Sequence, residues 1–321
     1  MSGIKIVMGG LGMGEAMAGS NPLAGEAGVK ELLPKLKELG VDTLDTAQLY
    51  GDSEKTLGNL DAGKDFIIDT KWFGGFKPGH ITKDSVVSLA KQSIETLKVK
   101  QVDIFYIHAP DDSVPIEETL EGVNEVYKLG LFKRFGLSNY KAEDVEKIYN
   151  LAKEKGYPVP QAYQGNYSAV ARLQETVLFP VLRKLNISFY AYSPIAGGFL
   201  TKTAEDIEKG AGRFDKNSPI GAMYHGMYAK PAYIKALKEW ASIAEEVGIS
   251  KAELAYRWVR FNSPLKPEYG DAIIIGGRTI DQVTQTLAGL NNGPLPDSAL
   301  KRIDAVWDTI KHEAPLDNYH K

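Results

Sequence analysis

The chain has 321 residues, of which 43% are hydrophobic and 25% charged, with a formal net charge of −3 and no cysteine. This composition allows a sizeable core and excludes disulfides, thiolate nucleophiles and cysteine-ligated zinc, and the slight negative charge argues against nucleic acid or an anionic membrane as partner. No apolar run reaches 18 residues and the start lacks a signal-peptide pattern, so we expect a cytoplasmic protein that does not span a membrane.

Short runs rich in β-branched and aromatic residues predict eight strands, at 4–8, 41–46, 66–71, 102–108, 134–138, 161–164, 187–192 and 272–275. The intervals between them hold helical patterns or room for one, most clearly at 31–40, 85–97, 115–128, 142–155 and after a capping box at 250–253. Strands that alternate with helices indicate a parallel sheet. Eight of them predict an α/β fold, a single (β/α)8 TIM barrel domain over residues 1–321. A doubly wound open sheet is the structural alternative.

The interval after the seventh strand, about 193–271, is long. It includes a stretch at 210–229 that carries glycine and methionine and has no clear period. We expect an ordered active-site loop there rather than a linker. A C-terminal helix and tail are expected after the eighth strand.

Four side chains with acid–base chemistry stand at or just after successive strand ends. Asp45 ends the second strand and Tyr50 follows five residues later, while Lys71 ends the third strand and His108 the fourth. The carboxyl ends of parallel barrel strands open on one mouth, so we expect these side chains to converge.

This set of residues can protonate a carbonyl oxygen. A lysine cation beside a tyrosine lowers the pKa of the phenol from its usual value of about 10. An aspartate supplies the counter-charge that a buried lysine needs, and a histidine can donate an N–H to the carbonyl oxygen. The hydride that reduction also requires must come from a cofactor.

The motif Asp45-Thr-Ala-x-x-Tyr50-Gly-x-Ser-Glu54, with Lys71 and His108 at the matching places, resembles the hallmark of the aldo-keto reductase superfamily. Segments such as Phe135-Gly-Leu-Ser-Asn-Tyr140 are similar to its aflatoxin-aldehyde reductase branch. The resemblance covers nearly the whole chain. It implies NADP(H)-dependent reduction of an aldehyde, or of a ketone as a second class, without a metal, by a monomer or homodimer. Tyr50 would be the general acid, assisted by Lys71 and Asp45, with His108 orienting the carbonyl.

The resemblance also implies a set of cofactor-binding residues. Ser138, Asn139 and Gln164 would hold the nicotinamide carboxamide, and Tyr192 would stack on its ring, although Tyr190 has the same strand-face parity. Two loops would contact the phosphates and adenosine, through Ser193, Ile195, Gly197, Gly198, Leu200, Arg213, Gly277, Arg278, Thr279, Gln282, Gln285 and Thr286. Arg278 could pair bidentately with a 2′-phosphate, which favours NADPH.

An apolar, aromatic substrate pocket is expected, lined by Met13, Trp72, Tyr140, Met223, Tyr224, Tyr228 and Tyr319. It favours aromatic or medium-chain aldehydes. The chain departs from the family pattern at Thr286, where an asparagine would contact adenine, and at His225 and Lys321, where the branch tends to have arginine. Asp69 lies two residues before Lys71 on the same strand face, is not part of the family pattern, and could compete with Asp45 for the lysine.

Other patterns suggest different functions. Gly10 and Gly12 hint at a dinucleotide-binding fingerprint, but Glu15 stands where its third glycine should be. Tyr149 and Lys153 mimic the pair of short-chain dehydrogenases, yet their spacing only makes them neighbours on a helix. The five histidines are scattered, which argues against a metal-dependent hydrolase. A cofactor-binding regulatory subunit on the same barrel, with little turnover, is the alternative function.

Overall fold

The computed structural model describes residues 3–15 and 21–320. Eight strands pair in parallel in chain order and close into a barrel through β1 and β8. They are β1 (Lys5–Gly9), β2 (Thr43–Asp45), β3 (Ile67–Trp72), β4 (Val102–Ile107), β5 (Phe132–Ser138), β6 (Pro160–Asn166), β7 (Ser188–Tyr192) and β8 (Ala272–Ile275). The predicted (β/α)8 barrel is confirmed, and the open sheet is excluded. Lys321, which the sequence comparison singled out, lies outside the described residues.

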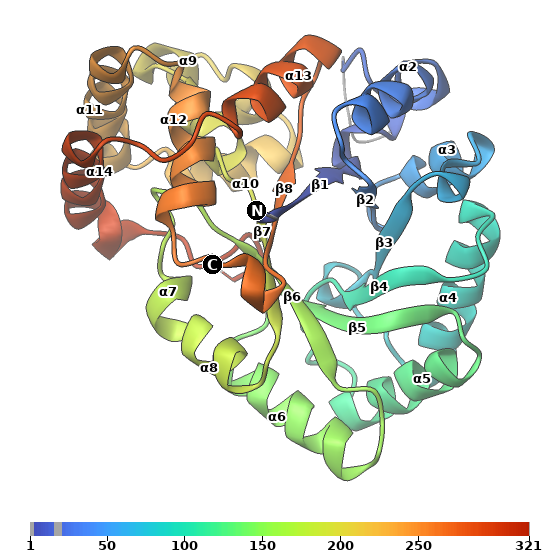
Figure 1. Cartoon of the computed structure of the whole chain (residues 1–321). Coiled ribbons are helices and arrows are strands. Elements are labelled where there is room, and N and C mark those ends of the chain that lie inside the picture. Colours follow the sequence, from blue (N-terminus) through green and yellow to red (C-terminus); the bar gives the residue numbers. More distant parts are fainter. Residues whose placement is uncertain (1–2, 16–20, 321) are drawn as a thin grey trace.

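Helices surround the strands (Figure 1). Those before β7 are α2 (Gly25–Glu38), α3 (Ser53–Asn59), α4 (Lys83–Leu97), α5 (Ile116–Lys128), α6 (Ala142–Glu154), α7 (Gln174–Val177) and α8 (Phe179–Lys184). Those after it include α11 (Pro231–Val247), α12 (Lys251–Arg257), α13 (Ile280–Gly289) and α14 (Asp297–Ile310). The first helix begins six residues before its expected start and contains Pro34. No helix among the described residues is long and apolar enough to cross a bilayer.

The segment after β7 is more regular than expected. It contains the 3-10 helix η4 (Ala196–Thr201), α9 (Ala204–Glu208), the 3-10 turn η5 (Gly212–Phe214) and α10 (Pro219–Tyr228), which corrects the interpretation of 210–229 as a loop. The side chain of Ser218 accepts a hydrogen bond from the amide of Gly221, and Pro219 occupies the first turn. Apolar residues lie around most of α10, so its sequence shows no single stripe from which a helix could be predicted.

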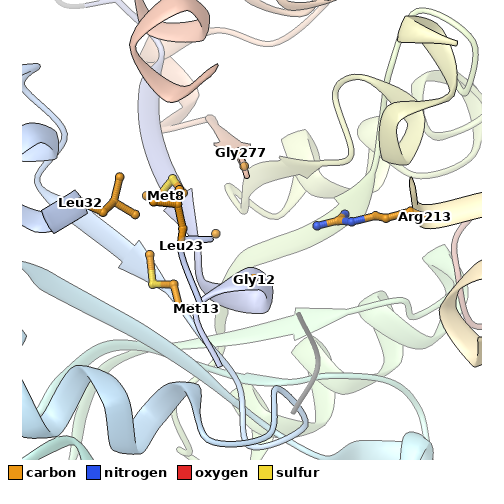
Figure 2. Close-up of a pocket in the computed structure, with 9 residues that line it drawn as sticks. Met8, Gly12, Met13, Leu23, Leu32, Arg213 and Gly277 are labelled. Carbon is orange, nitrogen blue, oxygen red and sulfur yellow. The ribbon is translucent and has the colours of Figure 1, made fainter. Parts of the chain in front are cut away.

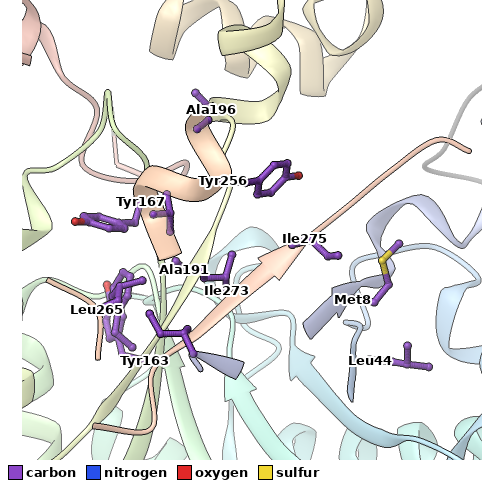
Figure 3. Packing of buried hydrophobic residues seen from close by; sticks show 14 of the residues in the cluster. Met8, Leu44, Tyr163, Tyr167, Ala191, Ala196, Tyr256, Leu265, Ile273 and Ile275 are labelled. Carbon is purple, nitrogen blue, oxygen red and sulfur yellow. The ribbon is translucent and has the colours of Figure 1, made fainter. Parts of the chain in front are cut away.

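Side chains alternate between the barrel interior and the layer under the helices. The interior cluster contains Val7, Ile104, Tyr106, Ala162, Tyr190, Ala272 and Ile274. Residues of opposite parity, such as Ile273 and Ile275 of β8, belong to the larger core that includes Tyr256 of α12 (Figure 3). The same alternation turns Asp69 and Lys71 of β3 inward and Trp72 outward.

The C-terminal tail returns to the carboxyl ends of the strands. After α14 the chain forms the 3-10 turn η8 (Lys311–Glu313), and the carbonyl of Leu316 then accepts a hydrogen bond from Gln174. The amide of Asn318 donates to the hydroxyl of Tyr192 at 3.3 Å. The tail is therefore attached to the end of β7, beside the residues expected to form the active site.

Candidate active site

Lys71 and Asp45 form a buried ion pair at the ends of β3 and β2. Lys71 has no exposed surface, and its Nζ lies 2.6 Å from Asp45 Oδ2 and 2.7 Å from the carbonyl oxygen of Thr46. The other carboxylate oxygen of Asp45 accepts a hydrogen bond of 2.8 Å from Gln164. Burial alone would lower the pKa of Lys71, but the charge and hydrogen bond of Asp45, together with Tyr50 and Asp69, favour the ammonium, so the pKa is raised. The lysine therefore carries its proton.

Tyr50 lies directly beside this ammonium group. Lys71 Nζ is 5.0 Å from the centre of the Tyr50 ring. Burial raises the pKa of Tyr50 and Lys71 opposes that rise through its charge and a hydrogen bond, while Asp45 adds to it. The effect of Lys71 has the expected sign, but the net pKa of Tyr50 is raised rather than lowered, because burial disfavours the phenolate more strongly than Lys71 favours it.

His108 directly follows β4 and lies beside Tyr50. The two rings meet edge to face with centroids 5.5 Å apart. His108 is buried, and burial together with the Lys71 charge holds the pKa of the imidazole well below its usual value. A neutral imidazole keeps one N–H to donate. Its Nδ1 is buried without a hydrogen-bond partner among the described residues.

The remaining residues of the motif support this arrangement. The hydroxyl of Ser53 donates to the carbonyl of Gly10 and accepts from Thr46. Glu54 is buried and accepts hydrogen bonds from Thr70 on β3 and Ser93 on α4. These contacts fix the start of α3 against β1, β3 and α4, and thereby fix the turn that carries Tyr50.

The residues expected to hold the carboxamide lie at the ends of β5, β6 and β7. Asn139 has a positive φ of 60°, donates to the carbonyl of His108 at 2.9 Å and accepts from Tyr192 at 2.8 Å. Ser138 accepts a further hydrogen bond from Asn139. Tyr192 thus stands at the mouth, whereas Tyr190 lies deeper and bonds to Arg134. Left-handed backbone at a residue such as Asn139 costs free energy and is concentrated at functional sites.

The loop after β7 has an unusual backbone. Ser193, Ala196, Gly197 and Gly198 all have positive φ, from 53° to 101°. A side-chain carbon added at Gly197 would lie 2.1 Å from the Tyr224 ring, whereas one added at Gly198 would meet no described residue within 4 Å. Leu200 is buried and Ile195 partly exposed. The open side of Gly198 allows a ligand to approach the backbone closely.

The loop after β8 provides groups suited to an anion. Thr279 caps α13 by accepting from the amide of Gln282 at 3.1 Å, and the side chain of Gln282 accepts from the amide of Arg278. Gln285 is exposed and Thr286 partly exposed on the same helix. A helix N-terminus favours a negatively charged group.

A small crevice of about 20 Å³ lies between this loop and the end of β1. It is lined by Met8, Gly9, Gly12, Met13, Leu23, Leu32, Arg213, Gly276 and Gly277 (Figure 2). Arg213 is exposed and lies across the crevice from Met13, which is buried. The crevice contains none of the four catalytic candidates. It brings Arg213 and Gly277, two predicted cofactor contacts, to the same place.

The predicted pocket residues separate into three groups. Trp72 has no exposed surface, stacks on Phe105 and donates to the carbonyl of Val86 on α4, so the structure places it in the core rather than in a pocket. Tyr228 is also fully buried and Tyr224 nearly so, with the Tyr224 ring packed against Gly197 of the loop after β7 and stacked on Tyr228. Tyr319 packs against Phe76 and Met223 is partly exposed on α10, whereas the hydroxyl of Tyr140 is buried without a partner in the described part of the chain.

Phe76, which the sequence analysis missed, forms one wall of the mouth. Its ring meets His108 with centroids 5.0 Å apart and Tyr319 with centroids 5.2 Å apart. A side-chain carbon added at Gly75 would lie 2.2 Å from the Tyr319 hydroxyl, so the tail packs directly on this loop. Asp317, also missed, orders the tail by accepting from the amides of Tyr319 and His320. The sequence pattern that could have indicated Phe76 is an aromatic residue that follows two glycines just after a strand.

Among residues 3–15 and 21–320, no three His, Cys, Asp or Glu side chains lie close enough to hold a metal ion. The four candidates instead form a compact acid–base group. It contains a protonated lysine, a protonated phenol, a neutral imidazole and a carboxylate.

The chain is similar in sequence to known oxidoreductases. The sequence profile of the Aldo/keto reductase family matches residues 5–308. Oxidoreductase sirO of Leptosphaeria maculans is 40% identical over 296 residues, which cover 92% of this chain and 89% of that protein. Aflatoxin B1 aldehyde reductase member 2 is 36% identical in Rattus norvegicus, over 98% of this chain and 87% of the rat protein. The Homo sapiens protein of the same name is 36% identical over 99% of this chain and 90% of its own length.

A match over nearly the whole chain, together with the closed barrel, confirms the resemblance to the aflatoxin-aldehyde reductase branch. The chain belongs to the aldo/keto reductase family, whose members are oxidoreductases that act on carbonyl groups with nicotinamide cofactors.

Proposed function

We propose that the protein reduces aldehydes, and ketones as a second class, to alcohols with NADPH. When bound, the nicotinamide supplies the hydride, which no side chain can supply. Tyr50 donates the proton to the carbonyl oxygen, and His108 orients that oxygen through an N–H hydrogen bond. The observation that carries the proposal is the buried Lys71 ammonium, held 2.6 Å from Asp45 and 5.0 Å from the centre of the Tyr50 ring.

The electrostatics of this group suit an acid that works near neutral pH. The raised pKa of Tyr50 keeps the phenol protonated before the reaction. As the proton leaves, the phenolate forms next to Lys71, whose positive charge stabilises it. Asp45 keeps that ammonium charged in a buried place. Tyr50 is partly exposed, so solvent can return its proton after each turnover.

The residues at the strand ends fit a dinucleotide. In this proposal Ser138, Asn139 and Gln164 bind the carboxamide, with Tyr192 against the ring. The loop from Ser193 through Ile195, Gly197 and Gly198 to Leu200 approaches the pyrophosphate, and the remaining contacts come from Gly277, Thr279, Gln282, Gln285 and Thr286. The exposed cations Arg213 and Arg278 support NADPH over NADH, because a guanidinium pairs well with a 2′-phosphate.

The mouth favours an apolar, aromatic substrate. His108 lies between the rings of Tyr50 and Phe76, and Phe76 packs against Tyr319. None of these four residues carries a cation that would select a substrate carboxylate. We therefore propose aromatic or medium-chain aldehydes, in line with the names of the rat and human relatives, which refer to an aldehyde.

Steady-state oxidation of NADPH with 4-nitrobenzaldehyde tests the proposal. We expect turnover by the wild type and a loss of roughly 10²- to 10⁴-fold in kcat for Tyr50→Phe, the usual contribution of general acid catalysis. NADPH binding, followed by fluorescence, should be unchanged. Tyr127→Phe changes an exposed tyrosine on α5 and should have no effect. Tight NADPH binding by a wild type that turns over no carbonyl compound would instead support a regulatory subunit.

A further inference from the structure

A second carboxyl group lies inside the barrel under the proposed catalytic group. Asp69 has no exposed surface and is the register partner of Asp45 across the β2–β3 pair. It precedes Lys71 by two residues on the same strand, so both side chains face the interior. The interior of such a barrel is normally a packed layer of branched apolar side chains. A buried carboxyl group at this place departs from that pattern.

Within residues 3–15 and 21–320, no cation forms an ion pair with Asp69. The lysine that it could share pairs with Asp45 and with the carbonyl of Thr46 instead. Asp69 Oδ1 accepts one hydrogen bond, of 3.0 Å, from the amide of Ile104, while Oδ2 is buried without a partner among the described residues. A buried carboxylate with one unpaired oxygen and no contacting cation is strongly disfavoured relative to the neutral acid.

The charged and titratable groups around Asp69 reinforce this preference. Asp45 on β2 and Asp103 on β4 raise its pKa further, and Lys5 on β1 lowers it. The hydroxyl of Tyr106 on β4 is also buried without a partner among the described residues, and the hydroxyl of Tyr190 on β7 accepts a hydrogen bond from Arg134 on β5. Burial and these neighbours together raise the pKa of Asp69 to about 7.

We propose that Asp69 is a positioning residue for carbonyl reduction, neutral in the active form of the enzyme and inhibitory when ionised. It does not touch the reacting atoms and acts through Lys71. An ionised Asp69 adds a second negative charge beside the ammonium, which cancels part of the field that Lys71 exerts on Tyr50. The phenolate is then less stabilised, and Tyr50 becomes a weaker acid. This inference rests on the proposed function.

The pH profile of kcat for aldehyde reduction tests it. Wild-type activity should fall as the pH rises through about 7. The loss should reach up to about tenfold by pH 8.5, the effect of a one-unit rise in the pKa of Tyr50. Asp69→Asn keeps the shape of the side chain but cannot ionise, so its profile should stay flat over this range at the level of the wild type at pH 6. If the asparagine variant does not fold, Asp69→Ala, which leaves room for a water molecule, replaces it in this test and should give the same flat profile.

Asp103→Asn provides the matched control. Asp103 is a partly buried carboxylate of the same barrel, but it is already paired with Arg134 at 2.6 Å. Its removal takes away a negative charge that raises the pKa of Asp69, so this variant should keep the decline in activity and shift it to lower pH.

Three outcomes are distinguishable. A decline near pH 7 that disappears only when Asp69 is replaced supports the inference. A decline that persists unchanged in Asp69→Asn, in an enzyme with normal turnover, overturns it and leaves the proposed function intact. A wild type without turnover removes the proposed function, and the inference with it.

Infrared spectroscopy measures the protonation of Asp69 directly. The band of a protonated carboxyl group should be present in the wild type at pH 6 and lost at pH 8.5. It should be absent from Asp69→Asn at both pH values.

Discussion

At the scale of single residues, Lys71 is both a buried charge that is unfavourable to desolvate and a neighbour of the proposed acid Tyr50. The side chain is fully buried, and its ammonium group replaces lost hydration with hydrogen bonds to the carboxylate of Asp45 and the carbonyl of Thr46. A buried ion pair of this kind contributes little net stability, but removal of one partner leaves the other charge unpaired. The pair is therefore better explained by its position next to Tyr50 than by a need to hold the barrel together.

Replacement of this lysine tests that view. We expect Lys71→Met to lower the free energy of unfolding by about 3–5 kcal/mol, because Asp45 is left buried and charged. Urea denaturation at pH 7.5 measures this. Lys37→Met is the surface control, since Lys37 pairs with Asp65 where both side chains are more than half exposed, and it should cost about 1 kcal/mol or less. The double variant Asp45→Asn with Lys71→Met should recover part of the loss. A double variant less stable than Lys71→Met would show that the unpaired charge is not the cause.

The sequence indicated the residues of this site but not their pairing. Two aspartates share the inward face with one lysine, and spacing alone could not decide between them. The structure shows that Asp45 takes the lysine, because its carboxylate reaches Nζ at 2.6 Å while Asp69 bonds to the amide of Ile104. Trp72 could have been excluded from the pocket earlier. Once Lys71 points inward, the next residue on the strand must point outward.

At the scale of elements, the loop after β7 combines left-handed backbone with close packing. Gly197 and Gly198 both have positive φ, but only Gly197 lies against the Tyr224 ring of α10. The two glycines therefore form a natural comparison between backbone strain and steric overlap.

We expect Gly198→Ala to lose about 1–3 kcal/mol of stability from backbone strain alone. Gly197→Ala should lose more, because its new methyl group would also overlap the ring at 2.1 Å. In a protein that already carries Tyr224→Ala, the further loss of stability caused by Gly197→Ala should fall to that of Gly198→Ala. Urea unfolding gives the stabilities, and NADPH titration should show weaker binding for both glycine variants. Equal losses at the two positions would mean that Tyr224 moves away freely and does not support the loop.

The helices differ in how well they could be predicted. Those between the early strands have one apolar face and clear ends, and α4, α5 and α6 lie within a few residues of their expected bounds. The helix α10 was missed because its apolar residues surround it. The contact between Gly75 and Tyr319 joins segments far apart in the chain, and nothing local in the sequence indicates it.

At the scale of the whole molecule, the fold follows from its strand pattern. All eight predicted strand runs correspond to strands, and no strand end differs from its expected position by more than two residues. Strands of a parallel barrel are covered on both sides, so they read as continuous apolar runs that are easy to recognise. The exact closure and stagger, which bring the ends of β2, β3 and β4 to one mouth, are properties of the assembled barrel.

Under the proposed function, the whole barrel brings a carbonyl group, a hydride donor and the Tyr50 proton together. Transfer of label tests it most directly. The protein is incubated with 4-nitrobenzaldehyde and NADPH carrying deuterium at both C4 positions of the nicotinamide, and the alcohol is analysed by mass spectrometry. We predict one deuterium on the alcohol carbon for every NADPH oxidised, and almost no product from Tyr50→Phe although it still binds NADPH. Unlabelled alcohol, or labelled alcohol formed equally fast by Tyr50→Phe, would contradict the claim.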